Sequence, residues 1–137
     1  MRLLLDTSAY SLAMRNSSDA VSLVREADEL ILCPITIGEL FAGFARGRRE
    51  TENRTVLKEF IRSPRVRLAT ISLETGGFYA KILNDLRMAG KPIPTNDIWI
   101  AACAMQEGAR LATSDRHFQA VPGLLCEFIV PDSAGVG

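Results

Sequence analysis

Short, mostly apolar runs alternate with helical patterns along the chain. Such runs are typical of strands that are buried on both faces of a parallel sheet. The first run, residues 3–5, is Leu-Leu-Leu and stops at Asp6. The predicted strands are residues 3–5, 30–33, 66–69, 110–113 and 127–130.

Two segments place apolar side chains at positions i, i+3, i+4 and i+7, which form one face of an α-helix. The first is predicted to begin near Thr36, after a strand closed by Pro34, and the second to stop at Gly90. The apolar positions are Ile37, Leu40, Phe41 and Phe44 in the first and Tyr79, Ile82, Leu83 and Leu86 in the second. Further helices are predicted after Asp6, over residues 19–27 and 56–61, and between a cap at Thr95 or Asn96 and Gly108.

Strands that alternate with helices predict an α/β fold. We expect a three-layer sandwich with a mostly parallel central sheet of four to five strands, flanked by helices. The length of 137 residues fits a single domain. Residues 1–132 are expected to be folded and residues 133–137 to form a loose tail.

The charge balance, apolar runs and cysteines of the chain limit what it binds and where it resides. Sixteen Lys and Arg balance sixteen Asp and Glu, so no bulk positive field attracts nucleic acid or an anionic membrane. The longest unbroken apolar run, residues 98–105, has eight residues, whereas a membrane-spanning helix needs about 20. The three cysteines, Cys33, Cys103 and Cys126, form no C-x-x-C pair and are predicted to be buried thiols. These features favour a cytoplasmic protein without a membrane anchor.

The chain has a single histidine, His117. This count excludes a His-rich zinc site and an H-E-x-x-H metalloprotease. No G-x-S-x-G, G-x-G-x-x-G or P-loop sequence is present, so a serine hydrolase elbow and the common nucleotide-binding loops are also excluded. Any catalysis must therefore depend on carboxylates.

Four acidic residues are predicted to meet at the carboxyl edge of the sheet, where ligands bind in open α/β folds. Asp6 follows the first strand and Asp115 the fourth, while Glu39 is expected in the first turn of the helix after the second strand. Asp97 is expected in the first turn of the helix that leads into the fourth strand, and the loop 91–96 must bring that turn to the same edge. Each acid alone has a simpler role as a helix cap, a first-turn acid or a turn residue.

Four carboxylates at one edge repel one another, and a divalent cation would neutralise them. We expect oxygen ligands only, with no His or Cys nearby, and therefore Mg²⁺, or Mn²⁺ in its place. Such a site hydrolyses phosphoryl groups by activating water and neutralising the charge that develops on phosphorus.

Four segments together resemble the PIN-domain ribonucleases and, among them, the VapC toxins of toxin–antitoxin pairs. They are Asp6-Thr7-Ser8, Ile37-Gly38-Glu39-Leu40, the helix start from Asn96 to Ala102, and the turn from Thr113 to Phe118. The resemblance implies that Asp6, Glu39, Asp97 and Asp115 hold Mg²⁺ or Mn²⁺, supported by Ser8, Ser114 and Asn96. It also implies a PIN-like fold and endonucleolytic RNA cleavage that leaves a 5′-phosphate and a 3′-hydroxyl.

The resemblance further implies a VapB-like antitoxin that fills an apolar groove, and a homodimer that pairs again in the complex with the antitoxin. Tyr10, Leu12 and Met14 with Phe41 and Phe44 are candidates to line that groove, or else are core side chains. The charged candidates to contact RNA or an acidic antitoxin segment are Arg46, Arg48 and Arg49, which otherwise form a solvated helix end.

Three alternatives stay open at this point. Another phosphate-processing fold is disfavoured, because Ser8 stands where a dehalogenase-like phosphatase needs a second acid. A catalytically silent PIN-fold interaction module has no need of four acids. A PIN nuclease in RNA maturation fits the sequence almost as well as a toxin does. The short single-domain length favours the toxin.

Overall fold

The computed structural model describes residues 1–132, and the predicted tail at 133–137 lies outside this part. Five strands form one sheet in the order β3-β2-β1-β4-β5, and all four neighbouring pairs are parallel. The strands are β1 (Arg2–Leu5), β2 (Glu29–Leu32), β3 (Val66–Leu68), β4 (Arg110–Thr113) and β5 (Cys126–Phe128). This arrangement confirms the α/β fold and makes the sheet wholly, rather than mostly, parallel.

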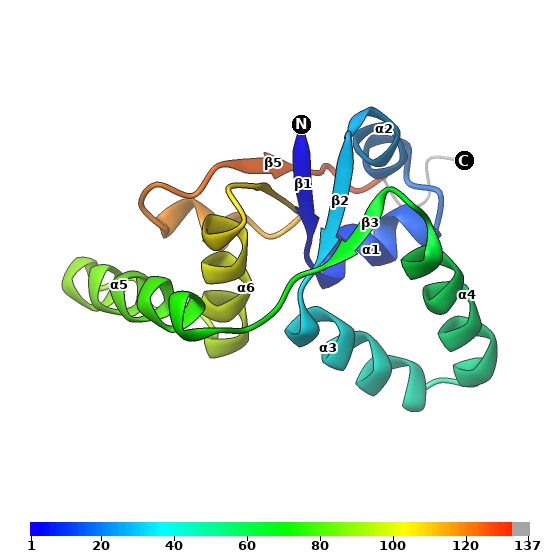
Figure 1. The fold of residues 1–137 in the computed structure, drawn as a ribbon, viewed down its shortest axis with the longest axis horizontal. Helices are drawn as coiled ribbons and strands as arrows, with labels where there is room; N and C mark the ends of the chain where they lie inside the picture. The colour runs from blue at the N-terminus through cyan, green and yellow to red at the C-terminus, as the bar shows by residue number, and fades with distance from the viewer. Residues whose placement is uncertain (133–137) are drawn as a thin grey trace.

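Helices cover both faces of the sheet and complete three layers (Figure 1). In the described residues they are α1 (Thr7–Met14), α2 (Ser18–Glu26), α3 (Pro34–Ala45), α4 (Glu50–Arg62), α5 (Leu73–Ala89) and α6 (Thr95–Gln106). A 3₁₀ turn, η1 (Arg116–Ala120), follows β4. Helices α5 and α6 pack on one face, and α1 to α4 lie on the other. No helix among residues 1–132 is long and apolar enough to cross a membrane.

The pleat of the first strand divides the core in two. Leu4 points into the cluster beneath α5 and α6, whereas Leu3 and Leu5 point into the cluster beneath α1 to α4. All three side chains are almost fully buried. A strand that is buried on both faces has no polar face, which explains the continuous Leu-Leu-Leu run.

Several predicted boundaries were wrong. Helix α3 begins at Pro34 rather than near Thr36, because the ring of Pro34 fits the first helical turn, where no backbone donor is needed. Pro94 occupies the cap position of α6, so Thr95 and Asn96 lie inside the helix. The last strand is residues 126–128 rather than 127–130. Helix α4 begins well before the predicted residues 56–61. Helix α5 begins at Leu73, before the first predicted apolar position at Tyr79, and stops at Gly90 as predicted. The turn η1 was not predicted.

The chain changes direction across the sheet beside β1. It runs outward from β1 to β2 and β3, and then returns through α5 and α6 to β4 on the other side of β1. Such a topological switch point leaves a crevice at the carboxyl ends of the central strands. The residues that follow β1, β2 and β4 therefore converge on one place.

All three cysteines are free thiols. Cys33 and Cys103 are buried as predicted, whereas Cys126 on β5 is only half-buried. The sulfur atoms therefore add no covalent link to the fold.

Candidate functional site

One cavity at the carboxyl edge of the sheet, about 730 Å³ in volume, brings the predicted acids together. Its lining includes all four acids, Asp6, Glu39, Asp97 and Asp115. Ser8 and Ser114 line the same cavity, and Asn96 lies at its side, where it contacts Glu39. These residues come from four different segments of the chain, so only the tertiary fold assembles them.

Asp6 is the most deeply buried of the four acids, with 5% of its surface exposed. Its Oδ1 accepts hydrogen bonds from Ser8 Oγ at 2.7 Å and from the backbone N–H of Ala9 at 2.8 Å. Its Oδ2 accepts a hydrogen bond from Thr113 Oγ1. Burial raises the pKa of Asp6 despite these three donors, and the charge on Asp115 raises it further. Asp6 therefore caps α1, as its simpler role required, and also faces the cavity.

Glu39 enters the cavity from α3. Because the helix begins at Pro34, Glu39 lies in the second turn and not in the first turn as predicted. Its Oε1 accepts a hydrogen bond from Thr7 Oγ1 at 2.6 Å, and its Oε2 accepts one from Asn96 Nδ2 at 3.3 Å. These contacts tie α3 to the starts of α1 and α6.

Asp97 lies in the first turn of α6, where it was predicted. Helix α6 feeds directly into β4, which runs parallel to its neighbours, so the helix must begin at the carboxyl edge of the sheet. Burial raises the pKa of Asp97, and the negative charges of Glu39 and Asp6 add to the effect, whereas His117 lowers it. The acids are thus close enough to repel one another.

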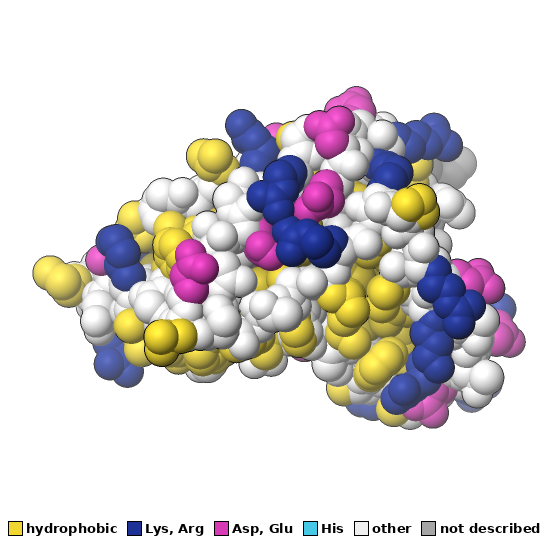
Figure 2. Space-filling view, viewed as in Figure 1, with side chains coloured by type: hydrophobic (Ala, Val, Ile, Leu, Met, Phe, Trp, Pro, Cys, Tyr) yellow, Lys and Arg dark blue, Asp and Glu magenta, His cyan; other side chains and the backbone are white. Residues whose placement is uncertain are grey.

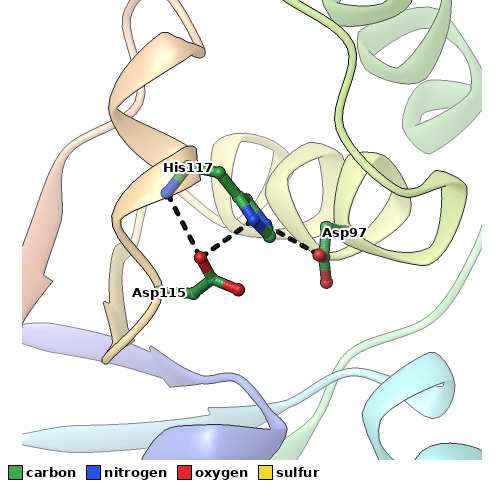
Figure 3. Close-up of side chains that lie close together, drawn as sticks. All are labelled: Asp97, Asp115 and His117. Carbon is green, nitrogen blue, oxygen red and sulfur yellow. Dashed lines mark hydrogen bonds and ion pairs between the residues drawn. The ribbon is translucent and has the colours of Figure 1, made fainter.

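Asp115 caps η1 and lies beside the single histidine (Figure 3). His117 stands between two carboxylates, with Nδ1 at 2.8 Å from Asp115 Oδ1 and Nε2 at 2.8 Å from Asp97 Oδ2. The expectation that no histidine lies near the acids was therefore wrong. The 3₁₀ turn explains the error, because it folds residue 117 back over residue 115.

Comparison with known proteins identifies the fold and its family. The family model described as "PIN domain" matches residues 3–124. Ribonuclease VapC1 of Haemophilus influenzae (strain R2866) is 31% identical over 126 residues, covering 88% of this chain and 92% of that protein. The chain belongs to the VapC family of PIN-domain proteins.

Solved structures of VapC-family complexes share the fold. The structure of VapBC-1 from nontypeable Haemophilus influenzae matches with a TM-score of 0.82 and 26% identity, covering 93% of this chain and 98% of that chain. VapBC-5 of Mycobacterium tuberculosis, described as a member of the VapBC family of toxin-antitoxin systems, matches with a TM-score of 0.70 and 22% identity, covering 93% and 97%. The second likeness shows the fold alone.

The donor atoms of this VapC-family chain fit a divalent cation. One donor atom each from Asp97, Asp115 and His117 lie within 4.8 Å of one another. Nε2 of His117 is buried, and the carboxylate of Asp97 at 2.8 Å is its one polar neighbour among the described residues. Two carboxylates and an imidazole nitrogen at this separation form a set of ligands that suits a divalent cation.

A second cavity, about 590 Å³ in volume, opens between α1, α3 and α4. The groove candidates Tyr10, Met14 and Phe44 line it, together with Arg46 and Arg49. Tyr10 is at the same time a core side chain, with 2% of its surface exposed. Three other predicted residues are absent from its lining. Leu12 lines the acidic cavity instead, Phe41 packs beneath the guanidinium of Arg54 at 4.1 Å, and Arg48 is an exposed side chain. Figure 2 shows apolar side chains gathered between α3 and α4, with Lys and Arg side chains beside them.

Three residues of the site had no predicted role. Thr113 holds Asp6, Thr7 holds Glu39, and His117 joins Asp97 and Asp115. Thr113 and His117 lie within the segment that carries the family resemblance, so the sequence indicated that they are part of the motif. Their contacts involve side chains up to 107 positions away in the chain, and no local sequence pattern predicts such contacts.

Proposed function

We propose that this chain is a metal-dependent endoribonuclease that acts as the toxin of a toxin–antitoxin pair. The observation that carries the proposal is the convergence of Asp6, Glu39, Asp97 and Asp115 on one cavity at the switch point of the sheet. The relative VapC1 of Haemophilus influenzae is named a ribonuclease. The proposed unit is a single PIN domain over residues 1–137.

The four acids have distinct proposed roles. Asp97 and Asp115 would hold Mg²⁺ or Mn²⁺, Asp6 would add a buried negative charge, and Glu39 would contribute a carboxylate from α3. Ser8 and Ser114 fix this arrangement, because Ser8 donates to Asp6 and accepts the backbone N–H of Ser114 at 3.0 Å. Asn96 orients Glu39. When bound, the cation supplies Lewis-acid activation of water and neutralises charge on the phosphate, which yields a 5′-phosphate and a 3′-hydroxyl.

The groove between α1, α3 and α4 is the proposed binding site for a VapB-like antitoxin. The groove and the acidic cavity share four lining residues: Thr7, Ser11, Arg15 and Glu39. An antitoxin segment in the groove would therefore end beside the acids and block access to them. Arg46 and Arg49 would contact an acidic part of that segment or, without antitoxin, the RNA backbone.

A homodimer, which pairs again in the complex with antitoxin, is part of the proposal. Leu73 and Met88, at the two ends of α5, are 95% and 89% exposed and are candidates for such contacts. The proposed compartment is the cytoplasm, where the three free thiols stay reduced. Size-exclusion chromatography with light scattering, before and after Leu73→Ser and Met88→Ser, tests the dimer.

The test of the activity is cleavage of a labelled RNA by purified protein in Mg²⁺ or Mn²⁺, with EDTA as the metal-free control. Asp6→Asn and Asp97→Asn should fold normally and lose cleavage and any growth arrest, whereas Glu59→Gln, an exposed acid on α4, should cleave normally. Cleavage by both site variants at matched protein concentration, or cleavage in EDTA, would contradict the proposal.

Two outcomes would favour the alternatives. Tight binding of RNA or a protein without any cleavage would indicate a silent interaction module. Cleavage of an RNA precursor without growth arrest in cells would indicate a maturation enzyme.

A further inference from the structure

His117 occupies an unusual place in the candidate site. It is the only histidine of the chain, and its imidazole stands between the side chains of Asp97 and Asp115 (Figure 3). The ring is about two-thirds buried, with 30% of the side chain exposed. The two carboxylates come from α6 and from the cap of η1, so the imidazole bridges two elements of the site.

The ring is held in this position from several sides. The backbone N–H of His117 donates to Asp115 Oδ1 at 3.2 Å, and Nδ1 lies 2.8 Å from the same oxygen. The imidazole packs against the ring of Phe118, with 4.8 Å between the ring centres. Phe118 itself is almost fully buried, so this contact is anchored in the core.

The outer nitrogen of the ring faces the carboxylate of Asp97. Nε2 is buried and lies 2.8 Å from Asp97 Oδ2, and it has no other polar partner within residues 1–132. Histidine ligands of metal ions present one ring nitrogen to the ion and the other to a carboxylate or another acceptor, and His117 has a carboxylate beside each nitrogen. Asp115 Oδ1 contacts both the backbone N–H and Nδ1 of His117, which holds the ring in place.

We propose that His117 supplies a nitrogen ligand to the divalent cation of the site, beside Asp97 and Asp115. The inference rests on the proposed nuclease function. It alters the expected ion, because Mg²⁺ prefers oxygen ligands, whereas an imidazole nitrogen favours a transition metal ion. The site should therefore select Mn²⁺ over Mg²⁺ more strongly than four carboxylates alone would.

A different role for His117 must be separated from this one. In that role the imidazole holds the two carboxylates at their separation and does not touch the ion. Its removal would then weaken Mn²⁺ and Mg²⁺ binding to a similar extent. Direct ligation instead predicts a loss that is larger for Mn²⁺, together with a magnetic coupling between the ion and the nitrogen.

Electron paramagnetic resonance on tag-free protein with Mn²⁺ tests the proposal directly. Pulsed measurements on the bound ion should detect an imidazole nitrogen coupling, and labelling the single histidine with ¹⁵N should change it. The coupling should disappear in His117→Gln. Mn²⁺ affinity should fall by about tenfold in that variant, while Mg²⁺ affinity, measured by competition, should change less than about threefold.

The outcomes separate the inference from the function on which it rests. Bound Mn²⁺ without nitrogen coupling, or a coupling that ¹⁵N-histidine leaves unchanged, would overturn the ligand role of His117. If Asp97→Asn still abolishes Mn²⁺ binding in that case, the acidic site stands. Absence of Mn²⁺ and Mg²⁺ binding to the wild-type protein would overturn the metal site and the proposed function together. The labelling experiment needs no variant, so it decides the question even if His117→Gln does not fold.

Discussion

Thr113 donates a hydrogen bond to Asp6 across two neighbouring strands, with 2.5 Å between Oγ1 of the threonine and Oδ2 of the carboxylate. The two residues end β4 and follow β1, which pair in parallel. Thr113 is fully buried, and its Oγ1 also accepts the backbone N–H of Asp115 at 3.0 Å. One hydroxyl therefore connects two acids of the candidate site.

Replacement of Thr113 by valine tests this connection, because valine keeps the shape of threonine and removes the hydroxyl. The carboxylate of Asp6 would lose a buried hydrogen-bond donor, and the backbone N–H of Asp115 would lose its acceptor. We expect the free energy of unfolding to fall by about 1–3 kcal/mol, as measured by urea denaturation. Thr113→Ser keeps the hydroxyl and is the control, so equal stability of the two variants would argue against the hydrogen bond.

The burial of Asp6 predicts a pH-dependent effect on stability. Burial raises the pKa of Asp6 in the folded chain above the unfolded value of 3.8. Such a group contributes stability below the unfolded pKa and loses it as the pH rises through the folded pKa. In EDTA, the stability of Asp6→Asn relative to the wild-type protein should therefore increase as the pH rises from 4 to 7.

Urea denaturation of both proteins at several pH values measures this difference. Glu59→Gln removes an exposed acid from α4 and should show no comparable pH dependence. The difference in free energy of unfolding between Asp6→Asn and the wild-type protein could instead stay constant over the whole pH range. That result would show that the charge of Asp6 does not destabilise the fold.

The end of α5 depends on a left-handed glycine. Gly90 has φ +67°, a conformation that costs other residues about 1–2 kcal/mol. Gly90→Ala should lower the free energy of unfolding by about that amount. Gly77 lies inside the same helix with open space around it, so Gly77→Ala should instead stabilise by about 0.5–1 kcal/mol. Thermal melts of the two variants should shift in opposite directions, and a shift in the same direction would contradict this assignment.

Arg46 and Arg49 are predicted to contact the RNA backbone when the groove is free. In an Asp97→Asn background, which prevents cleavage, replacing both with alanine should weaken RNA binding. The slope of log affinity against log salt should decrease by about 0.7 for each arginine that contacts a phosphate. Arg62→Ala, at the far end of α4, is the matched control. An unchanged slope in the double variant would exclude these contacts.

The sequence by itself determined the class of fold and the identity of the four acids. The apolar run of β1, the alternation of strands with helices and the short distances from strand ends to Asp6 and Asp115 are local features, and hydrophobic burial imposes them on the chain directly. The ends of helices and strands were predicted less accurately. Pro34 is an example, because a proline that ends a strand is also able to begin a helix.

Only the tertiary structure decided how the site is held together. Thr113 and Asp6 are 107 positions apart, and Glu39 and Asn96 are 57 apart, so their contacts depend on strand order and on helix packing rather than on spacing. The position of the His117 ring could not be predicted from the sequence either, because the 3₁₀ turn decides whether the ring faces solvent or the carboxylates. Periodicity reports which face of an element is buried, but the direction of a polar side chain at the end of a strand is set by the partners that the folded chain brings to it.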